Sequence, residues 1–469
     1  MTVQNFLSSR TPYAFADCPP QARSIYTTPD PAGYEPQLLY QVTRHGTRMP
    51  TAKRIRQMAK LENLLPQSRS PEHQWWIRNW TATFDELDAG YLHAVGEIEM
   101  QKMGQRLRDR FPHIFGPTYH PRQHAVISTQ VPRASASASA FAQGAWPCAA
   151  EGPSSGNTTT SDLTYQLQPF ESLCRPQPVA LTMMPKEADP LLRFFKLSPA
   201  YTAYLGSVRQ PLRAFRDREL RAVAEQLTHT LDIPGRNVGP DDAAALWQLC
   251  QWQAALSGIT DQACSLFSPE EIEHLEWVSD VELFVKKGYA VPEAFCMARP
   301  LLQDLSSAFQ AISRGETALP KARLHFAHAE TLLPLTSLLG LFGAPGAMPC
   351  TASRTNCHTD SMTGEEASDD TCPTDGLEGT AWPDTWPIFP RPPATRIWHG
   401  NMIVPFGANL AFLLYRPINN AAGRPPLVFT IYNEHYIPLP GCAHDYCELK
   451  EFLAILEPKS KGVTAAEVQ

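Results

Sequence analysis

The stretch Arg44-His-Gly-Thr-Arg-Met-Pro50 joins an apolar run to a helix-like run. Residues 38–42 read Leu-Leu-Tyr-Gln-Val, which is typical of a short buried strand, and residues 51–58 have the pattern of a helix. The stretch is therefore predicted to be a strand-to-helix loop with two arginines around one histidine. Such a loop makes a dense anion site, because each guanidinium offers a fork of N–H donors.

Each residue type in this loop suits phosphoryl chemistry. Arg44 and Arg48 can donate to phosphate oxygens, and Gly46 is expected to let the backbone approach a ligand without a clashing Cβ. His45 is a candidate nucleophile, because a neutral imidazole can accept a phosphoryl group and form a covalent intermediate. The alternative is a surface loop in which these side chains are merely solvated.

The stretch resembles the signature of the histidine acid phosphatases, a branch of the histidine phosphatase superfamily. The resemblance implies that His45 is phosphorylated during turnover while Arg44 and Arg48 hold the phosphate. It also implies an α/β fold, with a histidine-phosphatase-like sheet flanked by helices and an inserted, mostly helical cap domain. No metal or other cofactor is expected, since the arginines would supply the positive charge.

A second segment, residues 125–144, runs from a strand pattern through Arg133 into alternating Ser and Ala. The alternation alone would suggest a low-complexity linker. Phe141, however, follows at helical spacing from Ser137, and a helix rich in small residues can pack closely on a sheet. The family has a third phosphate-binding arginine in such a segment, so the resemblance gives that role to Arg133.

A third segment begins as an apolar strand at Leu324 and runs into a predicted helix over residues 331–342. His328 and Glu330 would stand at the strand end, where open α/β sheets bind ligands. Most histidine acid phosphatases carry His-Asp here. The His-Ala-Glu of this chain resembles the multiple inositol-polyphosphate phosphatase (His-Ala-Glu phytase) branch, which implies that His328 binds phosphate and that a protonated Glu330 is the proton donor. The alternative for His328 is a core histidine bonded to backbone.

The resemblance predicts a phosphomonoesterase that hydrolyses inositol polyphosphates, phytate included, through a phosphohistidine intermediate. A broad-specificity acid phosphatase or a 2,3-bisphosphoglycerate phosphatase could use the same site. An inactive homologue that binds phosphorylated ligands is an alternative of another class, although His45 and Glu330 are both present. Lys53, Arg54 and Arg56 either reach outer phosphates of the substrate or form a solvated helix face.

The charge balance fits a local anion site. The chain has 469 residues and a net charge of −7, so no general positive field favours nucleic acid. Any phosphate site must therefore be a local concentration of cations. Residues 403–415 are apolar but contain Pro and Gly and are too short to span a membrane. The expected partner is a small phosphorylated molecule, and the sequence leaves the oligomeric state open.

The 11 cysteines lack the Cys-x-x-Cys spacing of a zinc ribbon and suggest an oxidising compartment. The resemblance implies disulfides between Cys250 and Cys264 and between Cys442 and Cys447. A secreted or secretory-pathway location is expected, with a cytosolic protein of scattered thiols as the alternative. Residues 1–20 do not have the pattern of a signal peptide.

The chain is expected to divide into an α/β core, residues 1–155 and 316–469, and a helical cap, residues 156–315. Residues 343–395 are rich in Pro, Gly, Ser, Thr and Asp and are predicted to be a mobile loop. Further strands are predicted at 411–416 and 427–432, and further helices at 97–110, 212–231, 243–256, 269–287 and 292–314.

Overall fold

The computed structural model describes residues 2–19, 22–148, 177–316, 320–343, 396–418 and 423–461. Most of the loop predicted at 343–395 lies outside them. The strands are β1 Arg23–Ser24, β2 Tyr34–Arg44, β3 His124–Thr129, β4 Leu181–Met184, β5 Ala322–Ala327, β6 Asn409–Pro417, β7 Leu427–Tyr432, β8 His435–Ile437 and β9 Cys447–Glu448.

The helices begin with α1, which follows the Arg44–Pro50 stretch as predicted. They are α1 Ala52–Ala59, α2 Gln74–Ile77, α3 Ala94–Arg110, α4 Pro112–Phe115, α5 Pro132–Ala145, α6 Phe194–Leu197, α7 Pro199–Ser207, α8 Arg209–Glu219, α9 Arg221–Leu231, α10 Pro240–Ser257, α11 Pro269–Lys287, α12 Arg299–Ser313, α13 Ala329–Leu339, α14 Gly400–Ile403 and α15 Leu449–Ser460.

A nine-stranded sheet has the order β1-β8-β7-β6-β2-β5-β3-β4, with β9 paired to β7. The central strands β2, β5 and β3 are parallel, with Arg44 opposite Ala327 and Ser128 opposite Phe326. Their carboxyl ends therefore lie together at one edge. β2 is buried continuously from Leu38 to its end, as expected for a strand covered on both faces.

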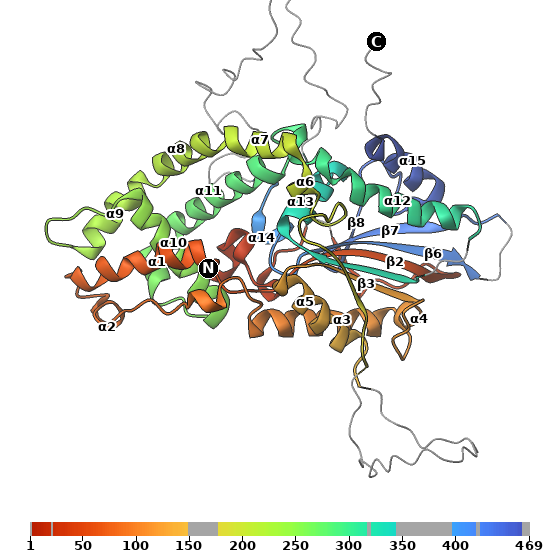
Figure 1. Ribbon diagram of the computed structural model, residues 1–469, viewed down its shortest axis with the longest axis horizontal. Coiled ribbons are helices and arrows are strands. Elements are labelled where there is room, and N and C mark those ends of the chain that lie inside the picture. The colour runs from red at the N-terminus through yellow and green to blue at the C-terminus, as the bar shows by residue number, and fades with distance from the viewer. Residues whose placement is uncertain are drawn as a thin grey trace, which may run out of the picture.

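Helices cover both faces of this sheet. In Figure 1, α3, α4 and α5 lie on one face and α12, α13 and α15 on the other. The Phe141 ring of α5 packs against Phe326 of β5 with centroids 5.3 Å apart. The predicted fold class, an α/β sheet flanked by helices, is confirmed. Within the described ranges, no helix is both long and apolar enough to cross a membrane.

A helical lobe, formed by α1, α2 and α7 to α11, lies beyond the carboxyl edge of the central strands (Figure 1). Helix α1 packs on α10, whereas α12 packs on α15 above the sheet. The predicted division into a core and a cap of residues 156–315 stays a prediction. Helix α1 precedes the predicted cap but lies in the helical lobe, and α12 belongs to the predicted cap but covers the sheet.

Two predicted helices are shorter than expected. The one at 212–231 divides into α8 and α9 at buried Leu220, whose ψ of −2° departs from the regular α-helical value. Residues 292–298 form two short 3₁₀ turns before α12, because Phe295 has a φ of −132° and its side chain is buried. Strands β4 and β8 have four and three residues, too few for periodicity to reveal them.

The small-residue helix α5 crosses α3 at two glycines. A Cβ on Gly144 would lie 1.8 Å from the Gln101 carbonyl oxygen, and one on Gly104 would lie 2.1 Å from that of Phe141. The Ser and Ala run is thus a helix in close contact, and the linker alternative is wrong. This crossing lies in the last turn of α5, whose first turn carries Arg133.

We predict that Gly144→Ala lowers the free energy of unfolding by about 1–3 kcal/mol, the usual cost of overpacking a core. Gly206→Ala is the matched control, because nothing lies within 4 Å of a Cβ at that helical position. Denaturant unfolding of both variants measures the effect. A Gly144→Ala protein as stable as the control would show that the two helices separate at no cost.

Candidate active site

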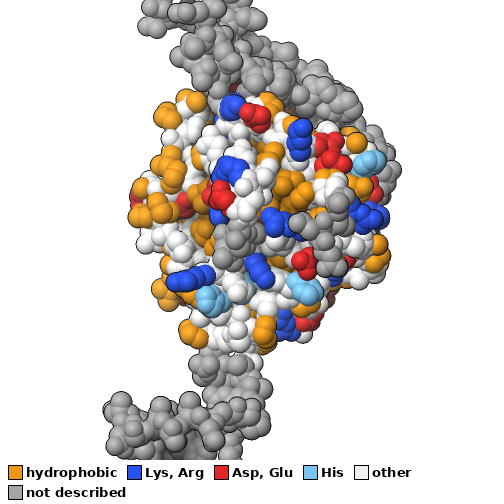
Figure 2. Space-filling view, turned by 90° about the vertical axis from the view of Figure 1, so that its right-hand side faces the viewer, with side chains coloured by type: hydrophobic (Ala, Val, Ile, Leu, Met, Phe, Trp, Pro, Cys, Tyr) orange, Lys and Arg blue, Asp and Glu red, His pale blue; other side chains and the backbone are white. Residues whose placement is uncertain are grey.

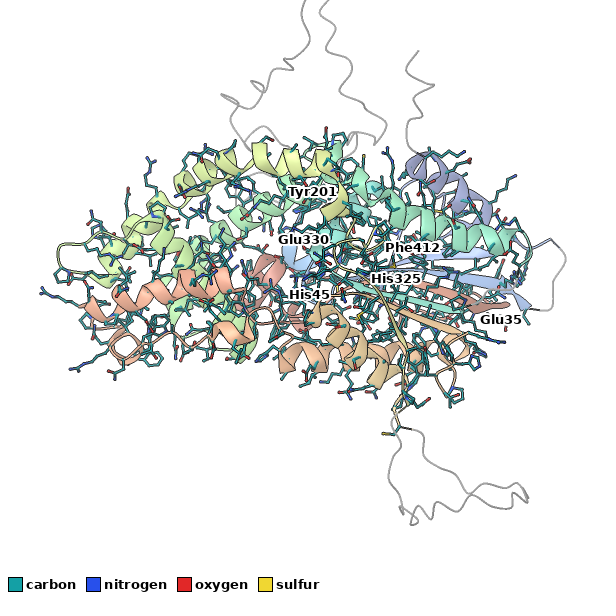
Figure 3. All side chains as sticks on the ribbon, viewed as in Figure 1. Glu35, His45, Tyr201, His325, Glu330 and Phe412 are labelled. Atoms are coloured by element: carbon teal, nitrogen blue, oxygen red, sulfur yellow. A yellow bond between two sulfur atoms is a disulfide. The ribbon has the colours of Figure 1, made fainter. Side chains whose placement is uncertain are left out.

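The Arg44–Pro50 stretch is tied to the neighbouring strand ends. The His45 N–H donates to the Ala327 carbonyl at 3.0 Å, and the His45 carbonyl accepts from the Gly407 N–H at 3.1 Å. The His45 side chain is buried, with 3% exposed. Figure 3 shows His45 and Glu330 at the sheet edge that faces the helical lobe, while Glu35, near the start of β2, lies at the far end.

The backbone of this loop is held by α3 and α5. The Gly46 N–H donates to Ser137 Oγ at 3.0 Å, and the Thr47 N–H and hydroxyl both donate to the Glu99 carboxylate at 2.9 Å. A Cβ on Gly46 would lie 2.7 Å from the Gly96 carbonyl oxygen. Glycine is therefore required at position 46 by the close approach of α3. The expected role of Gly46, letting the backbone approach a ligand, is not needed to explain the glycine.

The His45 ring has a defined tautomer. Its Nδ1 lies 2.9 Å from the Gly46 carbonyl oxygen. A carbonyl only accepts, so Nδ1 carries the proton and Nε2 carries the lone pair. Burial lowers the pKa of His45 well below its ordinary value, and nearby arginines, Arg133 first, lower it further. His45 is therefore neutral and has the electronic form of a nucleophile.

Arg44 and Arg48 are fixed by flat rings and by carbonyl groups. The Arg44 guanidinium lies 4.4 Å from the centre of the Phe406 ring, and its Nη1 donates to the Ser9 carbonyl at 2.6 Å. Arg48 lies 5.5 Å from the Trp252 ring centre. Burial lowers the pKa of Arg44 to about 10, which still leaves it charged at neutral pH.

The three predicted phosphate-binding arginines share a feature that Arg193 of the cleft also has. The Nε atoms of Arg44, Arg48 and Arg133 are buried, and none has an acceptor among the described residues. Buried N–H groups in folded proteins are almost always paired. Three unpaired guanidinium donors around one imidazole therefore form a site whose hydrogen bonds an oxyanion would complete.

His328 joins this site through side chains. Its Nδ1 lies 3.4 Å from Arg133 Nη2, and its Nε2 lies 3.1 Å from Thr129 Oγ1. Its ring centroid is 5.6 Å from that of His45. Burial, followed by the charge of Arg133, lowers the pKa of His328 to about 3, so it is neutral here. The alternative for His328 was a core histidine bonded to the backbone, whereas the partners of its ring are side chains.

Glu330 lies in the first turn of α13 beside the cleft and forms an ion pair. Its Oε1 lies 2.8 Å from Lys287 Nζ, at the end of α11. Desolvation alone would raise the pKa of Glu330, but the charge and hydrogen bond of the Lys287 ammonium, together with His328 and a backbone N–H, outweigh it and hold the pKa well below its ordinary value. Glu330 is thus ionised in this structure. The expected protonated form is not favoured here, because the nearby Lys287 ammonium stabilises the carboxylate.

The site opens into a cleft of about 1110 Å³ between the sheet edge and the lobe. Its wall carries four acidic side chains, Asp241, Asp242, Glu282 and Glu330, and twelve basic ones: Arg10, Lys53, Arg54, Lys60, Arg133, Arg193, Lys196, Arg209, Arg213, Arg216, Lys286 and Lys287. The opposite end of the molecule, where grey atoms do not cover it, shows both signs interspersed (Figure 2). The predicted local concentration of cations is therefore in the cleft.

The three basic residues of α1 separate into two sets. Lys53 and Arg54 line the cleft. Arg56 is exposed and pairs with Glu86 at 2.6 Å. For Arg56 this favours the alternative of a solvated helix face, because two residues along a helix turn it by roughly 200°, away from the face that Arg54 occupies.

Sequence reasoning missed nine of the twelve basic side chains of the cleft, among them Arg10, Arg193 and Lys287. Arg10 donates to Gln251 Oε1 at 2.6 Å, and Arg193 lies 5.9 Å from the centre of the Phe195 ring. Arg10 and Arg193 belong to no motif. Lys287 has the ordinary sequence pattern of a basic residue in the last turn of a helix, where the helix dipole favours it.

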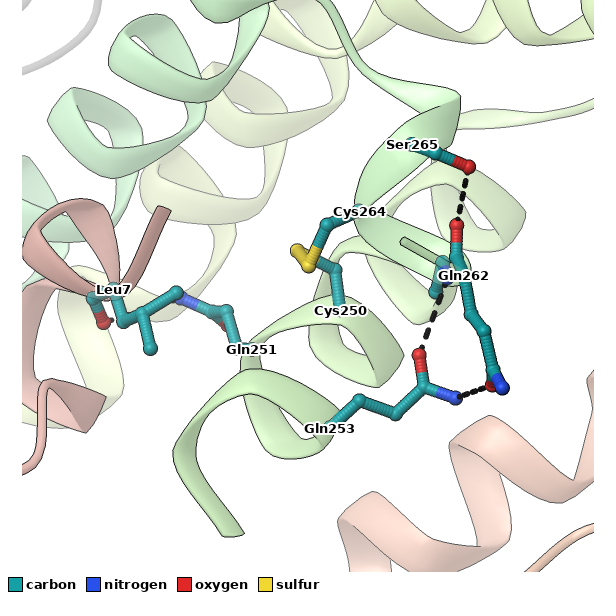
Figure 4. The surroundings of a disulfide bond; sticks show 8 residues. Leu7, Cys250, Gln251, Gln253, Gln262, Cys264 and Ser265 are labelled. Atoms are coloured by element: carbon teal, nitrogen blue, oxygen red, sulfur yellow. Dashed lines mark hydrogen bonds between the residues drawn. A yellow bond between two sulfur atoms is a disulfide. The ribbon is translucent and has the colours of Figure 1, made fainter. Parts of the chain in front are cut away.

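The structure joins Cys250 to Cys264 and Cys442 to Cys447. Figure 4 shows the first pair, which links α10 to the following turn. Beside it, the Ala263 N–H donates to Gln253 Oε1 at 3.2 Å. This bridge lies two residues from Trp252, so it steadies the ring that supports Arg48.

A neutral histidine ringed by arginines at the carboxyl edge of parallel strands defines a protein built to handle phosphoryl groups. A family model described as "Histidine phosphatase superfamily (branch 2)" matches residues 38–365. The chain therefore belongs to this branch of the histidine phosphatase superfamily and is a phosphatase.

The chain is similar to curated relatives over most of its length. It is 25% identical to multiple inositol polyphosphate phosphatase 1 of Gallus gallus, over 93% of this chain and 88% of that one. It is 24% identical to the Homo sapiens protein of the same name, over 86% of this chain and 75% of that one.

Two solved structures share the fold. A Bifidobacterium longum multiple inositol polyphosphate phosphatase, in complex with inositol hexasulfate, has a TM-score of 0.62 at 18% identity, covering 98% of this chain and 99% of that chain. The phytase from D. castellii has a TM-score of 0.63 at 15% identity, covering 99% and 87%. At these identities the likeness is one of fold.

Proposed function

We propose that this phosphatase hydrolyses inositol polyphosphates, phytate included, through a phosphohistidine intermediate. The observation that carries the proposal is the set of unpaired buried Nε donors on Arg44, Arg48 and Arg133 around the neutral His45 ring. The oxygens of a phosphoryl group would accept hydrogen bonds from those N–H donors, and the guanidinium charge would offset the negative charge that develops on these oxygens.

The reaction proceeds in two displacements. His45 Nε2 attacks phosphorus in line, so that a P–N bond forms while the ester P–O bond breaks with its electron pair on the inositol oxygen. Protonated Glu330 gives its proton to that oxygen. Water then attacks phosphorus, the P–N pair returns to Nε2, and the Glu330 carboxylate takes the proton from water.

The width and charge of the cleft support a polyphosphorylated substrate. Twelve basic side chains line it in a chain whose net charge is −7. One phosphate at His45 would use only the arginines nearest the ring, whereas Lys53, Arg54 and Arg10 lie along the wall, where other phosphates of one ring would reach them. The names of the curated relatives, and the inositol hexasulfate held by one structural neighbour, support the same substrate class.

We also infer an oxidising, secretory compartment, which the two cysteine pairs support. Peptide mapping under non-reducing conditions, on protein from a secretory host, is expected to recover Cys250 joined to Cys264 and Cys442 joined to Cys447. Free thiols at all four positions would remove the inference about compartment and would leave the catalytic proposal untouched.

For the nucleophile, we predict that His45→Ala abolishes release of phosphate from phytate while the circular dichroism spectrum stays that of the wild type. Turnover quenched in alkaline denaturant, which preserves P–N bonds, should leave phosphate on the His45 peptide of the wild-type protein. A His45→Ala variant with full activity would refute the assignment.

For the proton donor, we predict that the effect of Glu330→Gln depends on the leaving group. An inositol alkoxide leaves poorly without a proton, whereas a nitrophenolate leaves well, so phytate hydrolysis should fall by ~10²–10⁴-fold and nitrophenyl phosphate hydrolysis far less. The comparison holds where dephosphorylation of His45 does not limit both rates. Glu282→Gln, which removes another cleft carboxylate, is the control. Equal, small losses on both substrates would make Glu330 structural.

A further inference from the structure

The ion pair between Lys287 and Glu330 joins the two parts of the cleft. Lys287 ends α11 of the helical lobe, and Glu330 lies in the first turn of α13 on the sheet. Their charged atoms are 2.8 Å apart, and both side chains line the cleft. The Lys287 side chain is mostly buried, with 14% exposed, whereas that of Glu330 is 39% exposed. The pair therefore stands between the lobe and the nucleophile, within reach of a ligand.

Glu330 is an isolated acid in a basic environment. The charged side chains that act on it from the surrounding elements are basic. They are Lys287 of α11, Arg133 at the start of α5, and Arg44 and Arg48 of the Arg44–Pro50 stretch. The His328 imidazole and the Tyr201 phenol of α7 also interact with Glu330. In this structure Glu330 is the counter-charge of that group.

This arrangement conflicts with the chemistry required of Glu330. A general acid must carry a proton, and a carboxylate 2.8 Å from an ammonium group resists protonation. A polyphosphate brings several negative charges into the same cleft. Its phosphates compete with Glu330 for Lys287 and neutralise the arginines. The positive charge that stabilises the Glu330 carboxylate is therefore offset when the substrate binds.

We propose that Lys287 is a positioning residue that keeps Glu330 ionised in the empty site and releases it when a substrate phosphate takes over the ammonium group. Glu330 then takes a proton from solvent and transfers it to the departing inositol oxygen. The inference rests on the proposed role of Glu330 as proton donor. It adds that the acid is prepared by substrate binding.

This coupling selects for substrates with several phosphates. A small monoester held only at His45 leaves the Lys287–Glu330 pair intact, so its leaving group receives no proton. A multiply phosphorylated ring reaches Lys287 with a second phosphate and therefore prepares the acid that its own poor leaving group requires.

The chain offers a matched control in Lys286. It is adjacent to Lys287, lines the same cleft and is also paired with a carboxylate, but its partner is Glu282, four residues earlier in α11. Lys286→Met removes one positive charge from the cleft and leaves the pair at Glu330 in place. Lys287→Arg keeps a cation beside Glu330 and tests rescue.

The test is the pH dependence of kcat/KM for phytate in the wild type and in these variants. This quantity falls as the pH rises through the pKa of an acid needed in the free enzyme. Removing the Lys287 charge raises the pKa of Glu330, so the alkaline limb for Lys287→Met should move upward by ~1–3 pH units. Lys286→Met and Lys287→Arg should keep the wild-type limb. The substrate's own ionisation is common to all four proteins.

A Lys287→Met variant that raises KM without moving the limb would overturn the inference and make Lys287 a simple substrate contact. Failure of the proposed function is separate, because it would appear as a Glu330→Gln effect that does not depend on the leaving group.

A second measurement needs no folded Lys287 variant. Calorimetry of inositol hexasulfate binding, in buffers of different ionisation enthalpy, counts protons taken up. Near pH 5 the wild type should take up about one proton more than Glu330→Gln, because only the wild type has this carboxylate to protonate. Equal uptake would also overturn the inference.

Discussion

Three guanidinium groups crowded around one buried imidazole are the constraint on which the site depends. Their mutual repulsion and desolvation oppose the fold, and the surrounding structure offsets both. Phe406 and Trp252 supply ring faces to Arg44 and Arg48, and the Ser9 carbonyl accepts from Arg44. Glu330 supplies negative charge. Burial, followed by the charge of these arginines, keeps His45 neutral, so an arrangement suited to an oxyanion also preserves a nucleophile.

The sheet and its helices bring these groups together from distant parts of the chain. Parallel pairing of β2, β5 and β3 places Arg44, His328 and Arg133 at or just beyond three neighbouring strand ends. The close crossing of α3 and α5 then holds the loop backbone through Ser137 and Glu99. The helical lobe supplies the rest of the cleft wall. In the proposed function, residues at the strand ends hold one phosphoryl group, and residues of the lobe face the remainder of a larger substrate.

Much of this could be predicted from the sequence, since the motifs carry both the chemistry and the strand-to-helix pattern that positions it. Strands β2, β5, β6 and β7 follow from apolar runs, and α11 coincides with its predicted range. Arg44, His45, Arg48, Arg133, His328 and Glu330 do meet at one site. These are features that neighbouring residues in the chain determine together.

The remaining features depend on contacts between distant segments. The ionised state of Glu330 is set by Lys287, 43 positions earlier in the chain, and no local pattern links the two. Arg56 points away from the cleft and pairs with Glu86, because the packing of α1 on α10 decides which face of α1 lines the cleft. Gly46 is required by Gly96 of α3, a neighbour that the loop sequence does not reveal.

The central claim is that phosphoryl transfer passes through His45 in two in-line displacements. The stereochemical course at phosphorus tests it most directly, with a phosphorothioate ester made chiral by isotopic oxygen and hydrolysed in labelled water. Two successive inversions predict net retention of configuration at phosphorus. Net inversion would mean that water attacks the ester in a single step, and it would contradict the account.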